Sequence, residues 1–272
     1  MSEFEAFHRM EQTGWSDPAT ATQYASRFAQ ASVQCVPAMV DKAGVVSGQT
    51  ALDVCTGHGI VARGLVAAGA SVTGLDFSKA MLDMARTAVP EAKFVQGDAM
   101  ALPFADHSYD VVTIGFGVPH IPQPERAFAE AHRVLRPGGR LVYSVWQGGD
   151  SSVFGVVFGA IAAHGVPDVT LAPGPGAHDF ADPARAGAAL CDAGYSPPQF
   201  STVPSVWIVD DPGAPFDYFL EGTVRGGALL RPQTHAARCA IRAAVCEGVR
   251  ALCGDSGPWV VPIPAVLVSC RA

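Results

Sequence analysis

Short apolar runs alternate with segments of helical periodicity between residues 50 and 146. The apolar runs predict five strands, at 50–55, 71–77, 92–98, 109–116 and 139–146. The segments between them that carry apolar residues at helical spacing are GIVARGLVAAG, KAMLDMARTAV and ERAFAEAHRVL. Short apolar strands that alternate with helices are typical of a parallel sheet with helices on both faces.

The pattern becomes less regular after residue 146. It predicts helices at 151–165, 184–193 and across most of 213–254, a Pro/Gly-rich loop at 166–183, and strands at 200–210 and 259–271. Prolines in the last of these strands indicate an edge or a bulge. Without internal repeats we predict a single domain over 1–272, with N-terminal helices at 1–45, a cofactor-binding core at 46–146, and substrate-side insertions at 147–199 and 211–256.

Composition narrows the class of protein. The net charge of −7 argues against nucleic acid as the main partner, because phosphate contacts require a clustered positive surface. The longest apolar run, 152–163, is too short and too rich in glycine to span a membrane. Seven cysteines without a CxxC pair favour neither disulfides nor a metal site, and the first residues lack a signal pattern. We therefore expect a cytoplasmic protein without a metal.

The stretch ALDVCTGHGIVARG, residues 51–64, holds the most informative motif. It predicts a strand, a tight glycine loop and a helix N-terminus. In α/β folds, nucleotides usually bind at such a unit. Within it, GHGIVA satisfies the pattern Gly-x-Gly-x-x-Gly/Ala of nicotinamide-dependent dehydrogenases. An NAD-dependent oxidoreductase is therefore one interpretation of this loop.

Three carboxylates at the ends of successive strands favour a different nucleotide. Asp53 would repel a diphosphate but attract an ammonium group, and Asp76 can accept both hydroxyls of a ribose. Asp98 can accept the exocyclic amine of an adenine, with the apolar Ala99 and Met100 beside the ring. The loop contains no Lys or Arg. An ammonium group, a ribose and an adenine without phosphate describe S-adenosylmethionine.

The segments LDVCTGHG, VTGLDFSKAMLDMAR, GDAMALPFADHSYDVV and EAHRVLRPGGRLVYSV resemble the successive motifs of class I S-adenosylmethionine-dependent methyltransferases. The nearest subgroup by this resemblance is the ubiquinone/menaquinone-biosynthesis type, methyltransferase type 11. The resemblance covers about residues 20–146. It implies a Rossmann-like α/β fold whose seven-stranded sheet has six parallel strands and an antiparallel last strand, with helices on both faces and inserted lid helices.

The same resemblance implies which residues contact the cofactor. The methionine part would lie against the loop backbone at Gly57 and Gly59, with Asp53 at its amino group; Asp76 would take the ribose, and Asp98 the adenine amine. Further implied contacts are Tyr24, Phe77, Met81, Ala99, Met100, Gly115 and Phe116. The family usually has Gly-x-Gly-x-Gly, and Cys55 replaces its first glycine. We expect the Cys55 thiol to be structural and to touch the methionine part.

The acceptor side has weaker signals. His120, in the loop after the fourth strand, is the candidate general base, or else a histidine bonded to the loop backbone. Trp146, at the end of the fifth strand, either forms an aromatic wall of the acceptor pocket or packs in the core. On the helix that starts near Pro232, one stripe holds Arg231, His235, Arg238 and Arg242. This stripe is either a solvated surface, or its Arg238 and Arg242 bind a carboxylate or phosphate of the substrate.

These observations predict S-adenosylmethionine-dependent methyl transfer to a small lipophilic or aromatic acceptor, in quinone or secondary-metabolite biosynthesis. An oxygen, a nitrogen or a carbon could receive the methyl group. One alternative is a non-methylating cyclase or scaffold on the same fold, and the other is the NAD-dependent oxidoreductase. The sequence carries no signal for the identity of the acceptor or for the oligomeric state.

Overall fold

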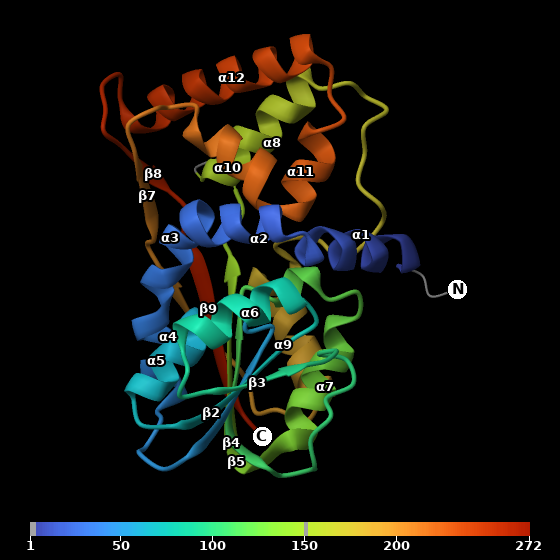
Figure 1. The fold of residues 1–272 in the computed structure, drawn as a ribbon, viewed down its shortest axis with the longest axis vertical. Helices are drawn as coiled ribbons and strands as arrows, with labels where there is room; N and C mark the ends of the chain where they lie inside the picture. Colours follow the sequence, from blue (N-terminus) through green and yellow to red (C-terminus); the bar gives the residue numbers. More distant parts are fainter. Residues whose placement is uncertain (1–3, 150–151) are drawn as a thin grey trace. The chain divides into compact units, whose positions relative to one another are not determined.

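The computed structural model describes residues 4–149 and 152–272, which divide into two compact units (Figure 1). The first unit falls within residues 1–31, 147–173 and 204–264, and the second consists of residues 32–146, 174–203 and 265–272. The motifs of the glycine loop and of the acidic strand ends all belong to the second unit.

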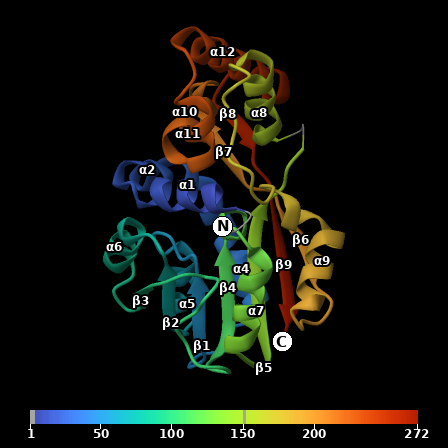
Figure 2. The same cartoon turned by 90° about the vertical axis from the view of Figure 1, so that its right-hand side faces the viewer.

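The second unit is built on a seven-stranded sheet. Its strands are β1 (Thr50–Val54), β2 (Ser71–Asp76), β3 (Lys93–Gln96), β4 (Tyr109–Gly115), β5 (Leu135–Trp146), β6 (Gln199–Val203) and β9 (Ala265–Arg271). They lie in the order β3-β2-β1-β4-β5-β9-β6. The strand β9, drawn in red in Figure 2, runs antiparallel to both of its neighbours, β5 and β6. The prediction of six parallel strands and an antiparallel last strand is therefore confirmed.

Helices cover both faces of this sheet. They are α4 (Val36–Ala43), α5 (Ile60–Ala67), α6 (Lys79–Ala88), α7 (Pro124–Val134) and α9 (Pro183–Asp192), with short turns η2 (Val33–Cys35), η3 (Val118–His120) and η4 (Asp179–Ala181). On one face α4 and α5 pack on each other and on β1, β2, β4 and β5; on the other, α7 packs on α9 and β5.

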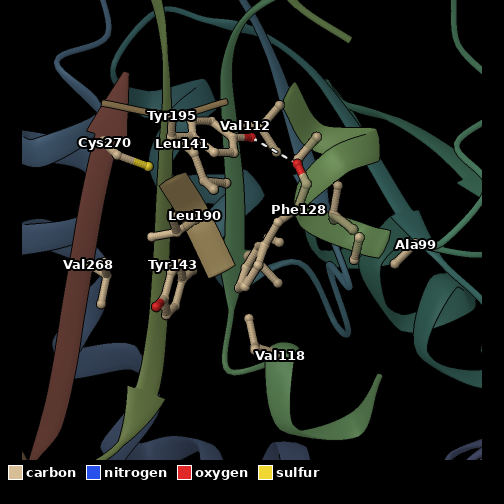
Figure 3. Packing of buried hydrophobic residues seen from close by; sticks show 14 of the residues in the cluster. Ala99, Val112, Val118, Phe128, Leu141, Tyr143, Leu190, Tyr195, Val268 and Cys270 are labelled. Atoms are coloured by element: carbon tan, nitrogen blue, oxygen red, sulfur yellow. Dashed lines mark hydrogen bonds between the residues drawn. The ribbon is translucent and has the colours of Figure 1, made fainter. Parts of the chain in front are cut away.

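The core between the sheet and the pair α7 and α9 follows the two-residue period of the strands. Leu52, Val112 and Leu141 point into it, together with Phe128 of α7 and Leu190 of α9 (Figure 3). The hydroxyl of Tyr195 donates to the carbonyl of Phe128 at 3.2 Å, so this buried polar group is satisfied. Burying these side chains fixes which residues of β1 and β4 face the opposite side of the sheet.

The first unit is mainly helical. It contains α1 (Glu5–Ser16), α2 (Pro18–Gln23), the π-helical turn η1 (Tyr24–Phe28), α8 (Val153–His164), α10 (Ala214–Gly222), α11 (Val224–Leu230), α12 (His235–Cys253) and a two-stranded sheet of β7 (Val206–Val209) and β8 (Trp259–Pro262). The short helix α3 (Ala29–Ser32) lies where the chain enters the second unit. These helices agree with the predicted helical segments, although 213–254 divides into three helices.

A buried ion pair ties the first helix of this unit to α11. Glu11 accepts from Arg225 Nε at 2.9 Å and from the indole nitrogen of Trp15 at 3.0 Å. The Arg225 guanidinium also lies over the ring of Phe7, 4.7 Å from its centroid. Because a buried carboxylate is costly unless it is paired, these contacts hold α1 against α11.

The two late segments predicted as strands, 200–210 and 259–271, do form strands, but each is divided in two. The break separates β6 from β7 at Pro204, and β8 from β9 at Ile263 and Pro264. A proline lacks the N–H that a sheet ladder needs, which favours a break at Pro204 and at Pro264. Ser205 and Ile263 pair across the break instead, with an N–H to carbonyl distance of 3.0 Å.

Candidate functional site

The candidate site lies at the carboxyl ends of β1, β2, β4 and β5. The strand order reverses between β1 and β4, because the chain continues from β1 to β2 and β3 on one side and returns to β4 on the other. In open α/β sheets, ligands bind in the crevice beyond the carboxyl ends at such a reversal. The glycine loop, 55–59, begins at this point.

The backbone of the loop turns through three left-handed residues. Cys55, Gly57 and Gly59 have φ angles of 55°, 55° and 86°. At Gly59 a side chain would also come within 3.3 Å of Ala85 and Val89, whereas the space beside the α-carbon of Gly57 is open. The loop therefore leaves its backbone accessible at Gly57, as the close approach of a ligand requires.

Asp53 is buried beneath this loop and is hydrogen-bonded through both of its carboxylate oxygens. Its carboxylate accepts from the hydroxyl of Thr113 at 2.7 Å and from the hydroxyl of Thr56 at 2.6 Å. Burial nevertheless raises the pKa of Asp53 to about 6, against the lowering by these two hydroxyls and by the N–H of Ala62. Asp53 thus links β1 to β4, to the loop and to the start of α5. Its contact with a cofactor amino group stays a prediction.

Asp76 ends β2 directly beside the loop. One carboxylate oxygen accepts from the N–H of Gly57 and the other from the N–H of Ser78, both at 2.9 Å. Burial raises the pKa of Asp76, while these two N–H groups and the charge of His120 act to lower it. Asp76 and His120, to which the sequence analysis gave different roles, are thus close enough to interact electrostatically.

Aromatic rings gather at the ends of β4 and β5. The ring of Phe116 stacks on that of Trp146, with centroids 4.0 Å apart and planes at 24°. Phe116 has a left-handed φ of 57°, and its N–H donates to both the side-chain and the backbone oxygen of Ser144, at 3.1 Å each. The carbonyl of Trp146 accepts from Nδ1 of His178 at 2.8 Å. The stack is thus held from its backbone, and both of its rings are buried.

Glycines beside the loop make room for its neighbours. At Gly117, the β-carbon of any other residue would lie 2.4 Å from the β-carbon of Cys55 and 2.8 Å from its sulfur. At Gly115 it would lie 2.9 Å from Val61, the second residue of α5. Burial raises the pKa of the Cys55 thiol well above its usual value, so the thiol stays protonated and suits packing rather than nucleophilic chemistry.

The other residues of this unit that the sequence predicts to contact the cofactor surround the ends of β2 and β3. Asp98 lies two residues beyond β3, is exposed, and accepts from the N–H of Met100 at 2.8 Å. Ala99 is buried and Met100 is half-buried against the core. The half-buried Phe77 follows β2, and the buried Met81 donates its N–H to Ser78 at the start of α6. Their contacts with an adenine stay predictions.

The residues of the first unit that the sequence predicts to contact cofactor or substrate are bonded to, or packed against, other residues of that unit. Tyr24 packs edge-on against Trp15 and stacks on Phe28, with centroid distances of 5.2 and 5.5 Å. Arg242 is ion-paired with Asp211 and with Asp217, and Arg238 donates to the carbonyl of Arg231 at 3.1 Å.

A hollow of about 530 Å³ between α1 and α11 is lined by Arg231 of the predicted cationic stripe, but not by Arg238 or Arg242. The substrate-binding roles of these two arginines stay predictions.

The chemistry of the second unit's site suits S-adenosylmethionine. Asp53 and Asp76 are buried carboxylates with raised pKa values, so a ligand that brings an ammonium group and hydroxyl donors relieves an unfavourable burial. A diphosphate would instead meet two carboxylates and a loop without Lys or Arg. Among residues 4–149 and 152–272, no cluster of His, Cys, Asp or Glu could hold a metal ion.

Comparison with known proteins agrees with this geometry. Residues 52–143 match the family described as a methyltransferase domain. Over 104 residues the chain is 47% identical to a demethylmenaquinone methyltransferase of Renibacterium salmoninarum, a match that covers 38% of this chain and 44% of that protein. The chain therefore aligns with less than half the length of this curated relative.

Solved structures share the fold at low sequence identity. A putative methyltransferase from Bacillus halodurans superposes with a TM-score of 0.56 at 20% identity, over 87% of this chain and 97% of that one. The 4+2 cyclase SpnF superposes with a TM-score of 0.53 at 19% identity, over 88% of this chain and 81% of that one. At such identities the likeness concerns the fold alone.

The fold, the loop and the matched segment define a class I S-adenosylmethionine-dependent methyltransferase core. The matched segment and the aligned relative bear out the family resemblance seen in the motifs. S-adenosylmethionine is the cofactor that a core of this class binds.

Sequence reasoning missed the hydroxyl residues that hold Asp53 and the backbone of Phe116 in place. Thr113 and Ser144 are buried polar residues within the apolar strands β4 and β5, and Thr56 lies inside the loop. A hydroxyl at a buried strand position was the available signal, because such a group must find a hydrogen-bond partner.

The described helices include none that is long and apolar enough to cross a membrane.

Proposed function

We propose that this protein transfers the methyl group of S-adenosylmethionine to a small apolar or aromatic acceptor of the quinone type. The observation that carries the proposal is the pair of buried acids, Asp53 and Asp76, beside an open glycine loop that lacks cations. The named activity of the aligned relative, demethylmenaquinone methyltransferase, supports a quinone-related acceptor.

When bound, S-adenosylmethionine supplies a methyl group on a sulfonium that is already reactive toward nucleophiles. Asp76 would bind the ribose hydroxyls through the oxygen lone pairs that Gly57 and Ser78 leave unused. Asp53 keeps the loop in its left-handed turn through Thr56, and would attract the amino group. The protein's main contribution is then alignment and exclusion of water.

The aromatic stack and the histidine would act on the acceptor. Phe116 and Trp146 offer a flat apolar wall at the ends of β4 and β5. His120 would accept the proton that the acceptor loses, either a hydroxyl proton or the ring proton displaced when a carbon is methylated. His120 would take up this proton during the transfer and would then release it to water.

Calorimetric titration of the wild type and of Asp76→Asn with S-adenosylhomocysteine and with NADH tests the cofactor assignment. We expect the wild type to bind S-adenosylhomocysteine and the variant to lose about 100-fold in affinity, since hydrogen bonds to a charged group are worth roughly 1.5–3 kcal/mol each. The matched control is Asp110→Asn at the amino end of β4, where the carboxylate pairs with Arg136 and Thr50. Binding of NADH without S-adenosylhomocysteine would overturn the assignment.

Methyl transfer needs its own assay. S-adenosylmethionine with a labelled methyl group is incubated with the protein and with reduced naphthoquinones that lack one ring methyl. Label in the quinone supports the proposal. Binding of the cofactor without transfer to any acceptor of a wider panel would favour the cyclase or scaffold alternative instead.

A further inference from the structure

A second hollow, of about 310 Å³, lies in the second unit away from the glycine loop. The side chains that line it are mainly polar and include three cations; the lining includes Lys42, Arg140, Ser196, Gln199, Ser269 and Arg271. No acidic residue is among the described residues that line it. In a chain with a net charge of −7, three cations around one hollow are unexpected.

The strand register brings two of these cations directly opposite each other. Arg140 of β5 and Arg271 of β9 are partners in the antiparallel ladder, so their side chains leave the same face of the sheet. Gln199 and Ser269 form the corresponding pair on β6 and β9, and Ser269 is two residues from Arg271 on that same face. Like charges at directly opposed positions destabilise a sheet unless something compensates them.

Local contacts account for only part of this charge. The guanidinium of Arg140 donates to the carbonyl of Ala43 at 3.2 Å, at the negative end of α4, and that of Arg271 donates to the carbonyl of Gly138 at 3.2 Å. Each guanidinium has five N–H groups, so most remain available. Across residues 4–149 and 152–272, neither arginine has a carboxylate within ion-pair distance, and Lys42 has none either.

The backbone is also shaped to receive one of these groups. Gly44 ends α4 with a left-handed φ of 57°, and a side chain there would lie 1.6 Å from an Nη atom of Arg140. Only a glycine lets the guanidinium of Arg140 occupy this position.

We propose that this hollow binds a small phosphorylated anion that carries two or more negative charges. Guanidinium groups match phosphate oxygens with paired hydrogen bonds, and the hydroxyls of Ser196 and Ser269 can add neutral donors. The volume is at the lower end of the range for small-molecule pockets, about 300–1,000 Å³. A phosphate or diphosphate group fits this space and charge, and it would compensate the opposed arginines.

The hollow is separate from the candidate cofactor site. Arg140 and Trp146 are six positions apart on β5, which corresponds to about 20 Å along the strand. Ser144 and Trp146 belong to the carboxyl edge of the sheet, whereas Arg140 is level with Val111 and Ala51 near the starts of β4 and β1. Binding here is therefore distinct from the binding of S-adenosylmethionine.

Thermal unfolding and calorimetry with inorganic pyrophosphate test the proposal, at an ionic strength held constant with sodium chloride. The variant is Arg271→Gln, and the matched control is Arg63→Gln, an exposed arginine of α5 that does not line the hollow. In chloride alone, Arg271→Gln should raise Tm by about 1–3 °C, because it removes the like-charge pair. Pyrophosphate should raise Tm of the wild type and the control, and bind Arg271→Gln at least about tenfold more weakly.

A charge-conserving variant and a second ligand make the test specific for this hollow. Arg271→Lys keeps the charge but loses the planar fork, so its Tm in chloride should equal that of the wild type while its affinity for pyrophosphate falls. Binding of S-adenosylhomocysteine should be the same in all four proteins, which keeps this test independent of the proposed function. The proposal is overturned if pyrophosphate affects Arg271→Gln and Arg63→Gln equally. It is also overturned if a single-stranded oligonucleotide binds the wild type more tightly than pyrophosphate does.

Discussion

The two edges of the large sheet differ in the sign of the charge that they hold. At the carboxyl edge, Asp53 and Asp76 are buried beside a loop without cations. Toward the amino edge, Arg140 and Arg271 face each other, and no carboxylate in the described part of the chain is within ion-pair distance of either; Asp110 and Arg136 nearby form a balanced pair. The same sheet therefore holds side chains of opposite charge at its two edges, and the charge that each edge lacks indicates the ligand that it would bind.

The largest expected effect is a loss of methyl-transfer activity when a residue near the carboxyl edge is replaced, but not when a residue near the amino edge is. His120→Gln should lower kcat for methyl transfer by about 1,000-fold, because a positioned base contributes roughly 10²–10⁴-fold. His107→Gln is the control, since Nδ1 of His107 bonds the carbonyl of Leu135 at the start of β5 and we expect less than a twofold change. Steady-state assays with a labelled methyl group, together with S-adenosylhomocysteine affinities that should not change, make the comparison. Equal kcat values for the two variants would remove His120 as the base.

A second prediction uses pH to test the buried acid. The pKa of Asp53 is raised to about 6 in the folded protein, so as pH rises this carboxyl ionises in the unfolded chain, near pH 4, before it ionises in the folded one. Between about pH 4 and pH 6 the unfolded state is therefore favoured increasingly, and the folded state loses stability. Relative to Asp53→Asn, the wild type should lose about 3 kcal/mol of unfolding free energy between pH 3 and pH 7, at roughly 1.4 kcal/mol per pKa unit. Urea unfolding at several pH values measures this difference.

The control for that experiment has the opposite sign. Hydrogen bonds from Arg136 and Thr50 lower the pKa of Asp110 despite partial burial, so its contribution is present near neutral pH and is lost in acid. The wild type should therefore gain stability relative to Asp110→Asn as pH rises. If the difference in unfolding free energy between the wild type and Asp53→Asn does not depend on pH, the pKa of Asp53 in the folded state equals its ordinary value.

The carboxyl edge of the sheet could be predicted from the sequence better than the amino edge. The first five strands and the helices between them are each bounded by local signals, such as the glycine loop before α5 and Pro124 at the start of α7. These signals also place Asp53 and Asp76 at strand ends, because position along a strand is a local property. The carboxyl edge was therefore predictable in its main residues.

The rest depends on register between segments that are distant in the chain. Thr113 lies opposite Asp53 only because β4 pairs with β1 in one register, and Arg271 meets Arg140 across 131 positions only because β9 is antiparallel to β5. The split of 200–210 into β6 and β7 was also missed, since a proline marks a break without telling which sheet each half joins. Pairing of this kind has no single-segment signal.

The smallest predicted effect concerns how the carboxyl edge is packed rather than charged. Gly117→Ala would bring a β-carbon to 2.4 Å from that of Cys55, and such overpacking typically costs about 1–3 kcal/mol. Cys55→Gly removes the obstructing side chain and suits the left-handed φ of 55°, so the double variant should recover most of the lost unfolding free energy.

Urea unfolding of the four proteins in this cycle gives the coupling directly. We expect a favourable coupling of about 1–2 kcal/mol between the two substitutions, since residues in contact do not behave additively. The double variant restores the glycine that related loops carry, so it should bind S-adenosylhomocysteine as the wild type does. Additive losses would show that the thiol does not fill the space beside Gly117. The strained turn at Cys55 would then have to be held by the N–H of Thr56, which donates to Leu75 at 2.9 Å, and by Asp53 beneath it.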